Sequence, residues 1–304
     1  MIRRFQYKDA IWVDIQTPTE EESRLIMEEF SVNPRVVNEM VSPSLKSRVE
    51  LHKDYLYVIL HFPVFRHSHT EETRQEVDFI VGRNFVITVR YDTIDAIEKF
   101  AKVIEVNTIL DRGIEENCTT IIFFGIVGEI YHSLAHELEY IDSHITTIEQ
   151  AIFDGREKEM VLALSHVGRN LLNFKKSTDF HKEVLGSLES FGKTIFDDHF
   201  SYHVRRIQNE YAKIQNMLRN NLESVVELRE TNNSLLSTKE NEIMKTLTIM
   251  AFTTFPLTLM AAMFSMDTKY TPIVGHPNDF WIILGIMFCA TMIFFTFFKY
   301  KKWF

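Results

Sequence analysis

Two apolar segments without a single charge lie near the C-terminus and limit what the chain can fold into. They cover residues 246–264 and 280–298, which is 19 residues each. Because an α-helix rises about 1.5 Å per residue, each segment would be roughly 28 Å long, close to the hydrocarbon thickness of a bilayer. The alternative is a pair of helices buried inside a soluble domain. That would need much surrounding protein, and only six residues follow the second segment, so this alternative is not favoured. The sequence therefore predicts two transmembrane helices.

The basic tail, residues 299–304, sets the expected topology. It reads KYKKWF and combines three lysines with Trp303. Lysines next to a membrane span favour the cytoplasmic side, and Trp is enriched at the membrane surface. Two crossings then bring the N-terminus to the same side. We expect both termini in the cytoplasm, a multi-pass protein of the cell (inner) membrane, and a short extracytoplasmic loop at 265–279.

The composition agrees with a long polar part joined to a short membrane part. Hydrophobic residues make up 45% and charged residues 25%, with a mean hydropathy of -0.09. The net charge of -9 provides no basic surface for nucleic acid. Two distant cysteines, Cys118 and Cys289, form neither a disulfide framework nor a zinc knuckle. The first residues lack the apolar core of a signal peptide. Since P-loop, nucleophile-elbow and dinucleotide motifs are also missing, we do not expect an enzyme.

The N-terminal part predicts a mixed α+β domain. Thr17 is a candidate helix N-cap, Pro18 suits the first helical position, and acidic residues follow in the first turn. A turn at 82–84 would join two strands as a hairpin. Short apolar or alternating runs predict strands at 11–15, 54–62, 76–82 and 84–91.

The following residues predict long helices. Helical periodicity favours a hairpin that turns near Asp154 and Gly155. From 193 to 255 there is neither Gly nor Pro, so one continuous helix of about 95 Å could lead into the first membrane span. The alternative is two helices joined near 231–234, where TNNS is a poor helix former. The expected apolar seam, with spacings of three and four, comprises Ile207, Tyr211, Ile214, Leu218, Val225, Leu228 and Leu235, with Asn221 and Asn232 at the remaining heptad places.

The predicted parts of the chain follow from these signals. They are a cytoplasmic α/β domain at 1–117, a cytoplasmic helical hairpin at 118–192, a stalk helix at 193–245, transmembrane helices at 246–264 and 280–298, the loop at 265–279 between them, and the basic tail at 299–304.

A stripe of polar, small and flexible side chains follows one face of the first span. A helix exposed only to lipid would not need these polar groups, whereas a helix lining a wet path or a close helix interface could use them. Since one helix cannot enclose a pore, the sequence predicts an oligomer around a common axis. The stripe consists of Asn241, Met244, Thr248, Ala251, Phe255, Thr258, Ala262 and Ser265.

Several motifs together resemble the CorA family of divalent-cation channels and transporters, the two-transmembrane GxN group. The resemblance implies a funnel-shaped homopentamer whose long stalk helix continues into an inner, pore-lining span. It also implies a pore lined by Asn241, Met244, Leu247, Ala251, Phe255, Thr258 and Ala262, of which the stripe contains six. The motifs are WVDIQTPTEEE at 12–22, SRVELHKDYLYVIL at 47–60, EVDFIVGRNFVITV at 76–89, the juxtamembrane segment at 241–264, and FFKYKKWF at 297–304.

The signature of the family is altered in this chain. CorA proteins carry Gly-Met-Asn nine residues after the proline of a PLT segment, and nine residues after Pro256 stand Ser265, Met266 and Asp267. The resemblance places these three residues at the selectivity loop. Asp267 keeps an oxygen acceptor for a hydrated Mg²⁺ and adds charge, and Lys269 follows it. We expect Asp267, with Asn241, to contact the cation.

Three further clusters can be weighed against metal binding. His132 and His136 are one turn apart, but the metalloprotease motif would need histidine at Tyr140, so a solvated helix face is favoured. The histidines and glutamates of 61–72 are expected in an exposed loop between strands. Glu223, Glu227 and Glu230 share one face of the stalk, which indicates a solvated stripe or, by resemblance, a regulatory cytoplasmic Mg²⁺ sensor.

The function expected from the resemblance is passage of a divalent cation through a homopentameric membrane pore. Mg²⁺ is the leading cation, with Co²⁺, Ni²⁺ and Zn²⁺ as related ones that could be transported or regulatory. One alternative is a Zn²⁺/H⁺ transporter of the ZntB type. Another, from a different class, is a non-conducting, membrane-anchored metal-sensing assembly that retains only the scaffold.

Overall fold

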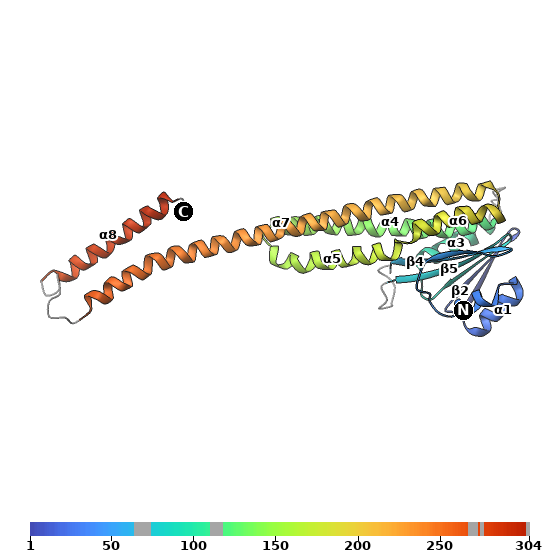
Figure 1. The fold of residues 1–304 in the computed structure, drawn as a ribbon, viewed down its shortest axis with the longest axis horizontal. Helices are drawn as coiled ribbons and strands as arrows, with labels where there is room; N and C mark the ends of the chain where they lie inside the picture. Colours follow the sequence, from blue (N-terminus) through green and yellow to red (C-terminus); the bar gives the residue numbers. More distant parts are fainter. Residues whose placement is uncertain (64–73, 110–117, 267–272, 274–276, 302–304) are drawn as a thin grey trace. The chain divides into compact units, whose positions relative to one another are not determined.

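A computed structural model gives the fold of the chain in two compact units (Figure 1). The first unit, Met1–Arg229, contains a six-stranded sheet and the helices packed on it. The second unit, Glu230–Phe304, contains the apolar helical segments. The structure describes residues 1–63, 74–109, 118–266, 273 and 277–301.

The sheet has the strand order β1-β2-β6-β5-β4-β3. Neighbouring strands are antiparallel except β2 and β6, which run parallel. The four predicted strands are confirmed, and the hairpin predicted at 82–84 joins β5 to β6. The two outermost strands, β1 and β3, were not predicted. The bounds are β1 Ile2–Tyr7, β2 Ala10–Gln16, β3 Arg48–Leu51, β4 Tyr55–Pro63, β5 Arg74–Gly82 and β6 Phe85–Arg90.

Two short helices, α1 (Glu20–Phe30) and α2 (Pro34–Glu39), cover one face of the sheet. The predicted N-cap, Thr17, is wrong. Thr19 caps α1 instead, because its hydroxyl accepts a hydrogen bond from the Glu22 amide at 3.2 Å while the Glu22 carboxylate accepts one from the Thr19 amide at 3.0 Å. This reciprocal pair satisfies two amides that a helix start would otherwise leave free.

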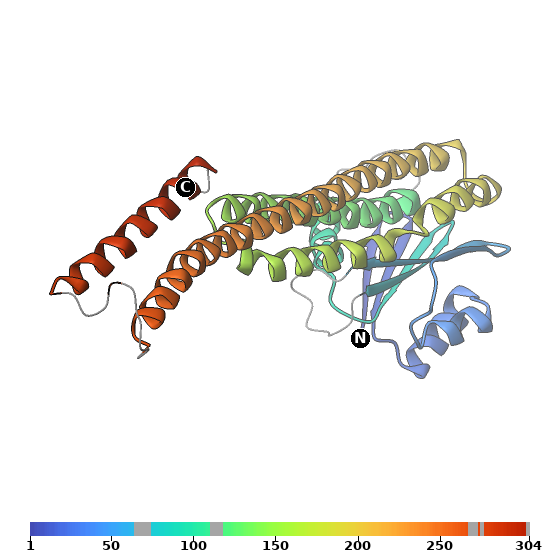
Figure 2. The same ribbon diagram turned by 60° about the vertical axis from the view of Figure 1, so that its left-hand side comes forward.

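The other face of the sheet carries the longer helices. Figure 2 shows the sheet between α1 on one side and α4, α5 and α6 on the other. Helix α3 (Asp95–Ile109), which was not predicted, contacts β1 and α4. Aromatic rings fill the layer between sheet and helices: Trp12 meets Phe100 with centroids 5.7 Å apart, and Phe79 meets Phe123 at 5.2 Å.

The predicted helical hairpin is confirmed at its turn but not along its second arm. Helix α4 (Cys118–Phe153) ends at Asp154 and Gly155, and Gly155 has φ 89, a left-handed conformation that glycine adopts freely. The second arm is divided into α5 (Glu157–Thr178) and α6 (His181–Ile195).

Helix α7 (Asp198–Phe264) contains 67 residues. It begins at Asp198 rather than at the predicted Lys193, because Lys193 belongs to the last turn of α6. The helix continues through 231–234, so the alternative of two helices joined there is wrong. In the first unit its seam residues are buried, Tyr211 partly, and the amide of Asn221 donates to the Leu138 carbonyl at 3.1 Å.

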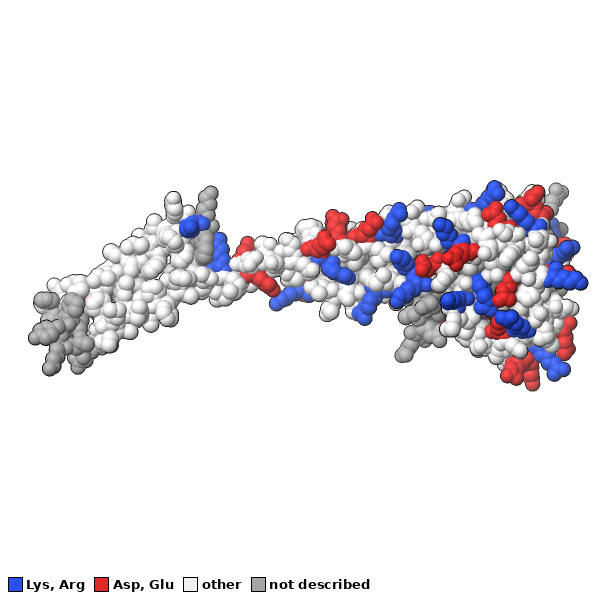
Figure 3. Space-filling view, in the orientation of Figure 1, with Lys and Arg blue, Asp and Glu red and all other residues white. Residues whose placement is uncertain are grey.

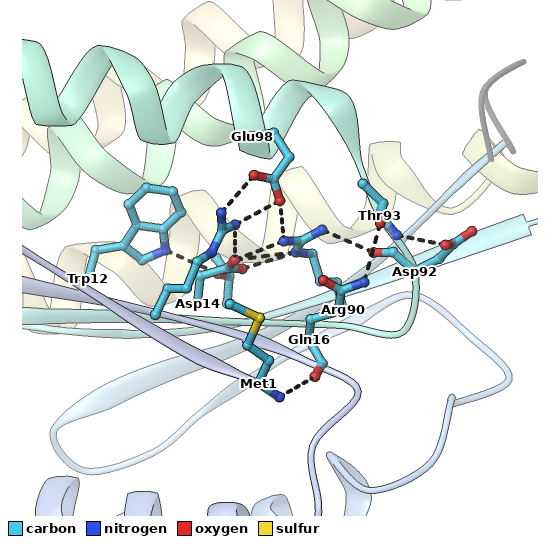
Figure 4. A network of polar contacts seen from close by, with 10 residues as sticks. Met1, Trp12, Asp14, Gln16, Arg90, Asp92, Thr93 and Glu98 are labelled. Carbon is cyan, nitrogen blue, oxygen red and sulfur yellow. Dashed lines mark hydrogen bonds and ion pairs between the residues drawn. The ribbon is translucent and has the colours of Figure 1, made fainter. Parts of the chain in front are cut away.

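A buried polar network ties β1, β2 and β6 to α3 (Figure 4). Asp14 and Arg90, each 1% exposed, form an ion pair at 3.0 Å. Arg3 donates to Asp14 at 2.7 Å and to Glu98 of α3 at 2.7 and 2.8 Å. Thr88 donates to Asp14 at 2.8 Å. Because buried charges are tolerated only when they are paired and hydrogen-bonded, this network fixes the position of α3 on the sheet.

Candidate functional site

The apolar helices of the second unit carry the candidate site. Among the described residues, three helices are long and apolar enough to cross a membrane: α4, α7 and α8 (Asp279–Tyr300). Most of the apolar window of α4 is buried inside the first unit, so α4 is a core helix. The apolar windows of α7 and α8 have no buried residue. They coincide with the predicted transmembrane helices at 246–264 and 280–298.

These exposed surfaces require an apolar environment. Phe280, Trp281, Phe288 and Ile293 of α8 are each about two-thirds exposed. On the face drawn in Figure 3, uncharged side chains form the surface of the membrane segments, and charged side chains gather on the first unit. Since contact with water costs about 25 cal/mol per Å² of apolar surface, lipid or further copies of the chain must cover these helices.

The predicted polar stripe forms one face of α7. At 100° per residue, the residues from Asn241 to Ser265 in the stripe, together with Leu247, fall within an arc of about 120°. All of them are exposed or half-exposed in the single chain, and Phe255 is the most exposed of the large ones at 77%. The structure therefore places the predicted pore residues together on one face of one helix.

The hydroxyl groups of the two threonines in this stripe can accept hydrogen bonds from outside the helix but cannot donate them. The Thr248 hydroxyl donates to the Met244 carbonyl at 2.7 Å, and the Thr258 hydroxyl donates to the Thr254 carbonyl at 2.9 Å. Because each hydroxyl proton is used inside the helix, only oxygen lone pairs remain for an outside partner. Oxygen acceptors are the ligands and water-shell partners that Mg²⁺ prefers.

Pro256 interrupts the hydrogen-bond ladder within the same segment. It lacks an amide proton and cannot donate to the carbonyl of Phe252, four residues earlier. Thr253 and Thr254, which the sequence analysis did not single out, donate their hydroxyls to carbonyls of the preceding turn at 2.8 to 2.9 Å. A span in lipid tolerates a freed carbonyl only where protein or water can satisfy it.

The helix ends where the altered signature begins. The Ser265 amide donates to the carbonyls of Ala261 and Ala262 at 3.1 and 3.2 Å, which closes the last turn. Ser265 and Met266 are exposed. Asp267, the residue expected to contact the cation, lies outside the described residues, as does Lys269.

A family model described as CorA-like Mg²⁺ transporter protein matches residues 7–301. The chain belongs to this family. The cobalt/magnesium transport protein CorA of Thermotoga maritima is 24% identical over 275 residues, which is 90% of this chain and 77% of that protein. The cobalt/magnesium transport protein CorA of Methanocaldococcus jannaschii is 23% identical over 300 residues, 98% of this chain and 93% of that protein.

Solved structures confirm the CorA-like fold. The complete CorA magnesium transporter from Methanocaldococcus jannaschii superposes with a TM-score of 0.85 at 21% identity, over 99% of this chain and 93% of that one. The full-length CmaX protein gives 0.74 at 12% identity, over 97% and 89%. The cytoplasmic domain of ZntB from Vibrio parahaemolyticus gives 0.61 at 10% identity, over 76% and 90%.

The stalk glutamates of this CorA-family chain do not form a metal-binding cluster with other side chains among the described residues. Glu223 and Glu227 of the first unit and Glu230 of the second are all exposed. Within the described part of the chain, no three His, Cys, Asp or Glu side chains are grouped so that they could hold a metal ion. The predicted sensor site therefore stays a prediction.

The histidine cluster predicted in an exposed loop at 61–72 needs one correction. His61 lies in β4 and is buried, with Nε2 2.9 Å from Glu76 and Nδ1 3.0 Å from the Ser47 hydroxyl. Residues 64–72 of the cluster lie outside the described residues. His61 is thus a structural residue of the sheet. His132 and His136 are exposed on α4, as expected of a solvated helix face.

Proposed function

We propose that this chain moves divalent cations, with Mg²⁺ as the leading cation and Co²⁺ as a related one, across the cell membrane. The observation that carries the proposal is the stripe of oxygen acceptors that continues into the uncharged segment of α7 in a CorA-family chain. The relatives of Thermotoga maritima and Methanocaldococcus jannaschii are named as cobalt/magnesium transport proteins, which supports the same class of cargo.

The proposed assembly is a homopentamer in the cell (inner) membrane, with both termini in the cytoplasm. A single α7 helix exposes its stripe on one side only, so several copies must face a common axis to enclose a path. Lipid then covers α8, whose large apolar side chains are exposed. The family resemblance supplies the number five and the funnel shape.

Within this assembly, Asn241, Thr248 and Thr258 offer oxygen atoms to the hydrated cation. Met244, Leu247 and Phe255 form apolar rings that close a narrow pore by excluding water. The small residues Ala251 and Ala262 leave room between these rings.

The proposed entrance is the segment Ser265, Met266 and Asp267, which follows α7 in the sequence. A ring of carboxylates attracts a dication more strongly than a ring of amides, because each copy adds a charge to an oxygen acceptor. The cation docks there with most of its water shell, since Mg²⁺ loses water reluctantly.

Two measurements test this function. The first is Mg²⁺ flux into liposomes that contain a Mg²⁺-sensitive dye, with protein-free liposomes as the blank. We expect wild type and Asp267→Asn to carry flux, and Asp267→Ala to lose it. Asp279→Asn removes the other acid of the predicted segment 265–279, at the first residue of α8, and serves as the matched control, with flux like wild type. Equal flux in all variants would show that Asp267 does not act on the cation.

The same measurement separates the alternatives. Flux in Asp267→Asn but none in wild type would indicate the non-conducting metal-sensing assembly. Zn²⁺ flux that stops when a proton gradient is collapsed, without Mg²⁺ flux, would indicate a Zn²⁺/H⁺ transporter.

The second measurement tests the assembly by cross-linking. Cysteine replaces Thr258 in a chain that also carries Cys118→Ala and Cys289→Ala. If α7 lines a common axis, oxidation in membranes yields covalent dimers, because neighbouring cysteines meet near the axis. Mild lysine cross-linking of the same sample gives a ladder that ends at five copies. A ladder that stops at two copies would contradict the pentamer.

A further inference from the structure

A histidine pair on α4, remote in sequence from the membrane segments, has the geometry of a metal chelate. His132 and His136 are one helical turn apart and both exposed. Their Nε2 atoms lie 3.2 Å from each other, and their ring planes are inclined by 68°. The two rings thus bring the same ring nitrogen together on the surface of α4, an arrangement that a merely solvated face does not require.

The separation of the two nitrogens fits one metal ion. With metal–nitrogen bonds of about 2.1 Å, nitrogens at this separation subtend an angle of about 100° at the metal. That angle lies between about 90° of an octahedral or square-planar site and about 109° of a tetrahedral one. The spacing of the two nitrogens therefore suits one such ion.

A carboxylate lies beside one ring of the pair. Glu139 Oε2 lies 3.3 Å from His136 Nδ1. In the tautomer with the proton on Nδ1, this N–H donates to the carboxylate and the lone pair of His136 is on Nε2, the atom 3.2 Å from His132 Nε2. Carboxylates in this position orient metal-bound histidines in many proteins. The two Nε2 atoms share one hydrogen bond, in which one ring donates and the other accepts. A bound cation replaces this bond, and the Nε2 proton moves through solvent to Nδ1 of the same ring, so that both Nε2 lone pairs are available to the metal.

The geometry points to a transition-metal site at His132 and His136, for Ni²⁺, Zn²⁺ or Co²⁺ but not for Mg²⁺. Imidazole suits the former ions, whereas Mg²⁺ requires oxygen ligands. No third His, Cys, Asp or Glu side chain joins the pair among the described residues. Water molecules therefore complete the coordination shell, and the bound ion stays exchangeable. This site does not depend on the proposed transport.

The test is residue-resolved histidine modification of the full-length protein in detergent. Diethyl pyrocarbonate reacts with free imidazole nitrogens, and peptide mass spectrometry reads each histidine separately. With NiCl₂ at ten times its Kd, the modification of both His132 and His136 should slow about tenfold. His144 is the matched control, because it is exposed on the same helix with Tyr140 and Ile148 one turn away. MgCl₂ should protect none of the three.

The single variants decide whether the two rings act together. In His132→Gln, Ni²⁺ should no longer protect His136, and in His136→Gln it should no longer protect His132. The variant His144→Gln should leave both protected. Equal protection of all three histidines, no protection in wild type, or continued protection of one ring after loss of the other would each overturn the site. Ni²⁺ bound elsewhere in the protein does not affect this readout.

Discussion

A buried histidine at the start of α6 should make the first unit sensitive to acid. His181 is 0% exposed, and its Nε2 lies 2.8 Å from the His61 carbonyl oxygen. Its Nδ1 lies 2.7 Å from the Tyr131 hydroxyl. In the neutral ring, Nε2–H donates to the carbonyl and Nδ1 accepts the hydroxyl proton. Burial lowers the pKa of His181 from 6.5 to about 4, although the His61 carbonyl favours the charged form.

The sign and the size of the effect follow from this shift. The unfolded chain binds a proton at His181 below about pH 6.5, whereas the folded chain does so only below about pH 4. Between these values the unfolded state holds more protons, so stability falls as the pH falls. At about 1.4 kcal/mol per pKa unit, lowering the pH from about 7.5 to 4.5 should remove about 2.5 kcal/mol.

The perturbation that tests this is His181→Gln, which is neutral at every pH. Because hydrogen bonds are lost, the variant should be less stable at pH 7.5 by about 1–3 kcal/mol. The decisive quantity is the difference between the two pH values, measured by urea unfolding of residues 1–229 with circular dichroism. The variant should lose about 2.5 kcal/mol less than wild type between about pH 7.5 and 4.5. His144→Gln, an exposed control, should behave like wild type. Equal acid sensitivity in wild type and His181→Gln would refute the reasoning.

Three other predictions concern separate parts of the molecule. Replacing Arg90 by Met leaves Asp14 buried with one ion-pair partner fewer, and urea unfolding should show a loss of about 3 kcal/mol or more. Burial, and then the charge of Glu76, raises the pKa of Asp78 well above its usual range. Because the folded protein holds this proton more tightly than the unfolded chain, the free energy of unfolding of wild type falls as the pH rises. The free energy of unfolding of Asp78→Asn, measured by urea unfolding, should therefore rise relative to that of wild type from about pH 4 to 8. Met244→Ser should raise basal Mg²⁺ leak in liposomes, and unchanged flux would place the gate elsewhere.

The sequence predicted the long periodic elements because their signals are local. An uncharged run of 19 residues or a long stretch without Gly and Pro leaves few alternatives, so α7, α8 and the turn at Gly155 could be predicted. Strand β1 could not, because IRRFQY contains two adjacent arginines and resembles an exposed loop. In the structure Arg3 pairs with Asp14 and Glu98, which are distant in sequence.

The break between α5 and α6 shows the same limit. Asp179 and Phe180 include neither Gly nor Pro, so nothing local marks an end of the helix. The break places His181 against Tyr131 and the His61 carbonyl, contacts that only the folded chain provides.

The candidate site on α7 was predictable as a stripe, since one helix face needs only the helical period. The number of copies around it depends on contacts between chains, which no single helix encodes.

Two kinds of atoms that can bind a metal ion, oxygen and nitrogen, lie in different units of this chain. Two possible effects of transition metals on transport can therefore be separated. The α7 stripe offers oxygen atoms, whereas the α4 pair offers imidazole nitrogens. If Ni²⁺ alters Mg²⁺ flux by competing in the pore, the effect must persist in His136→Gln. If it acts through α4, the effect must disappear in His136→Gln while Mg²⁺ flux without Ni²⁺ stays at the wild-type level. Because His136 lies in the first unit and the stripe in the second, this substitution leaves the oxygen atoms of the α7 stripe unchanged. Loss of Mg²⁺ flux in His136→Gln without Ni²⁺ would contradict that separation.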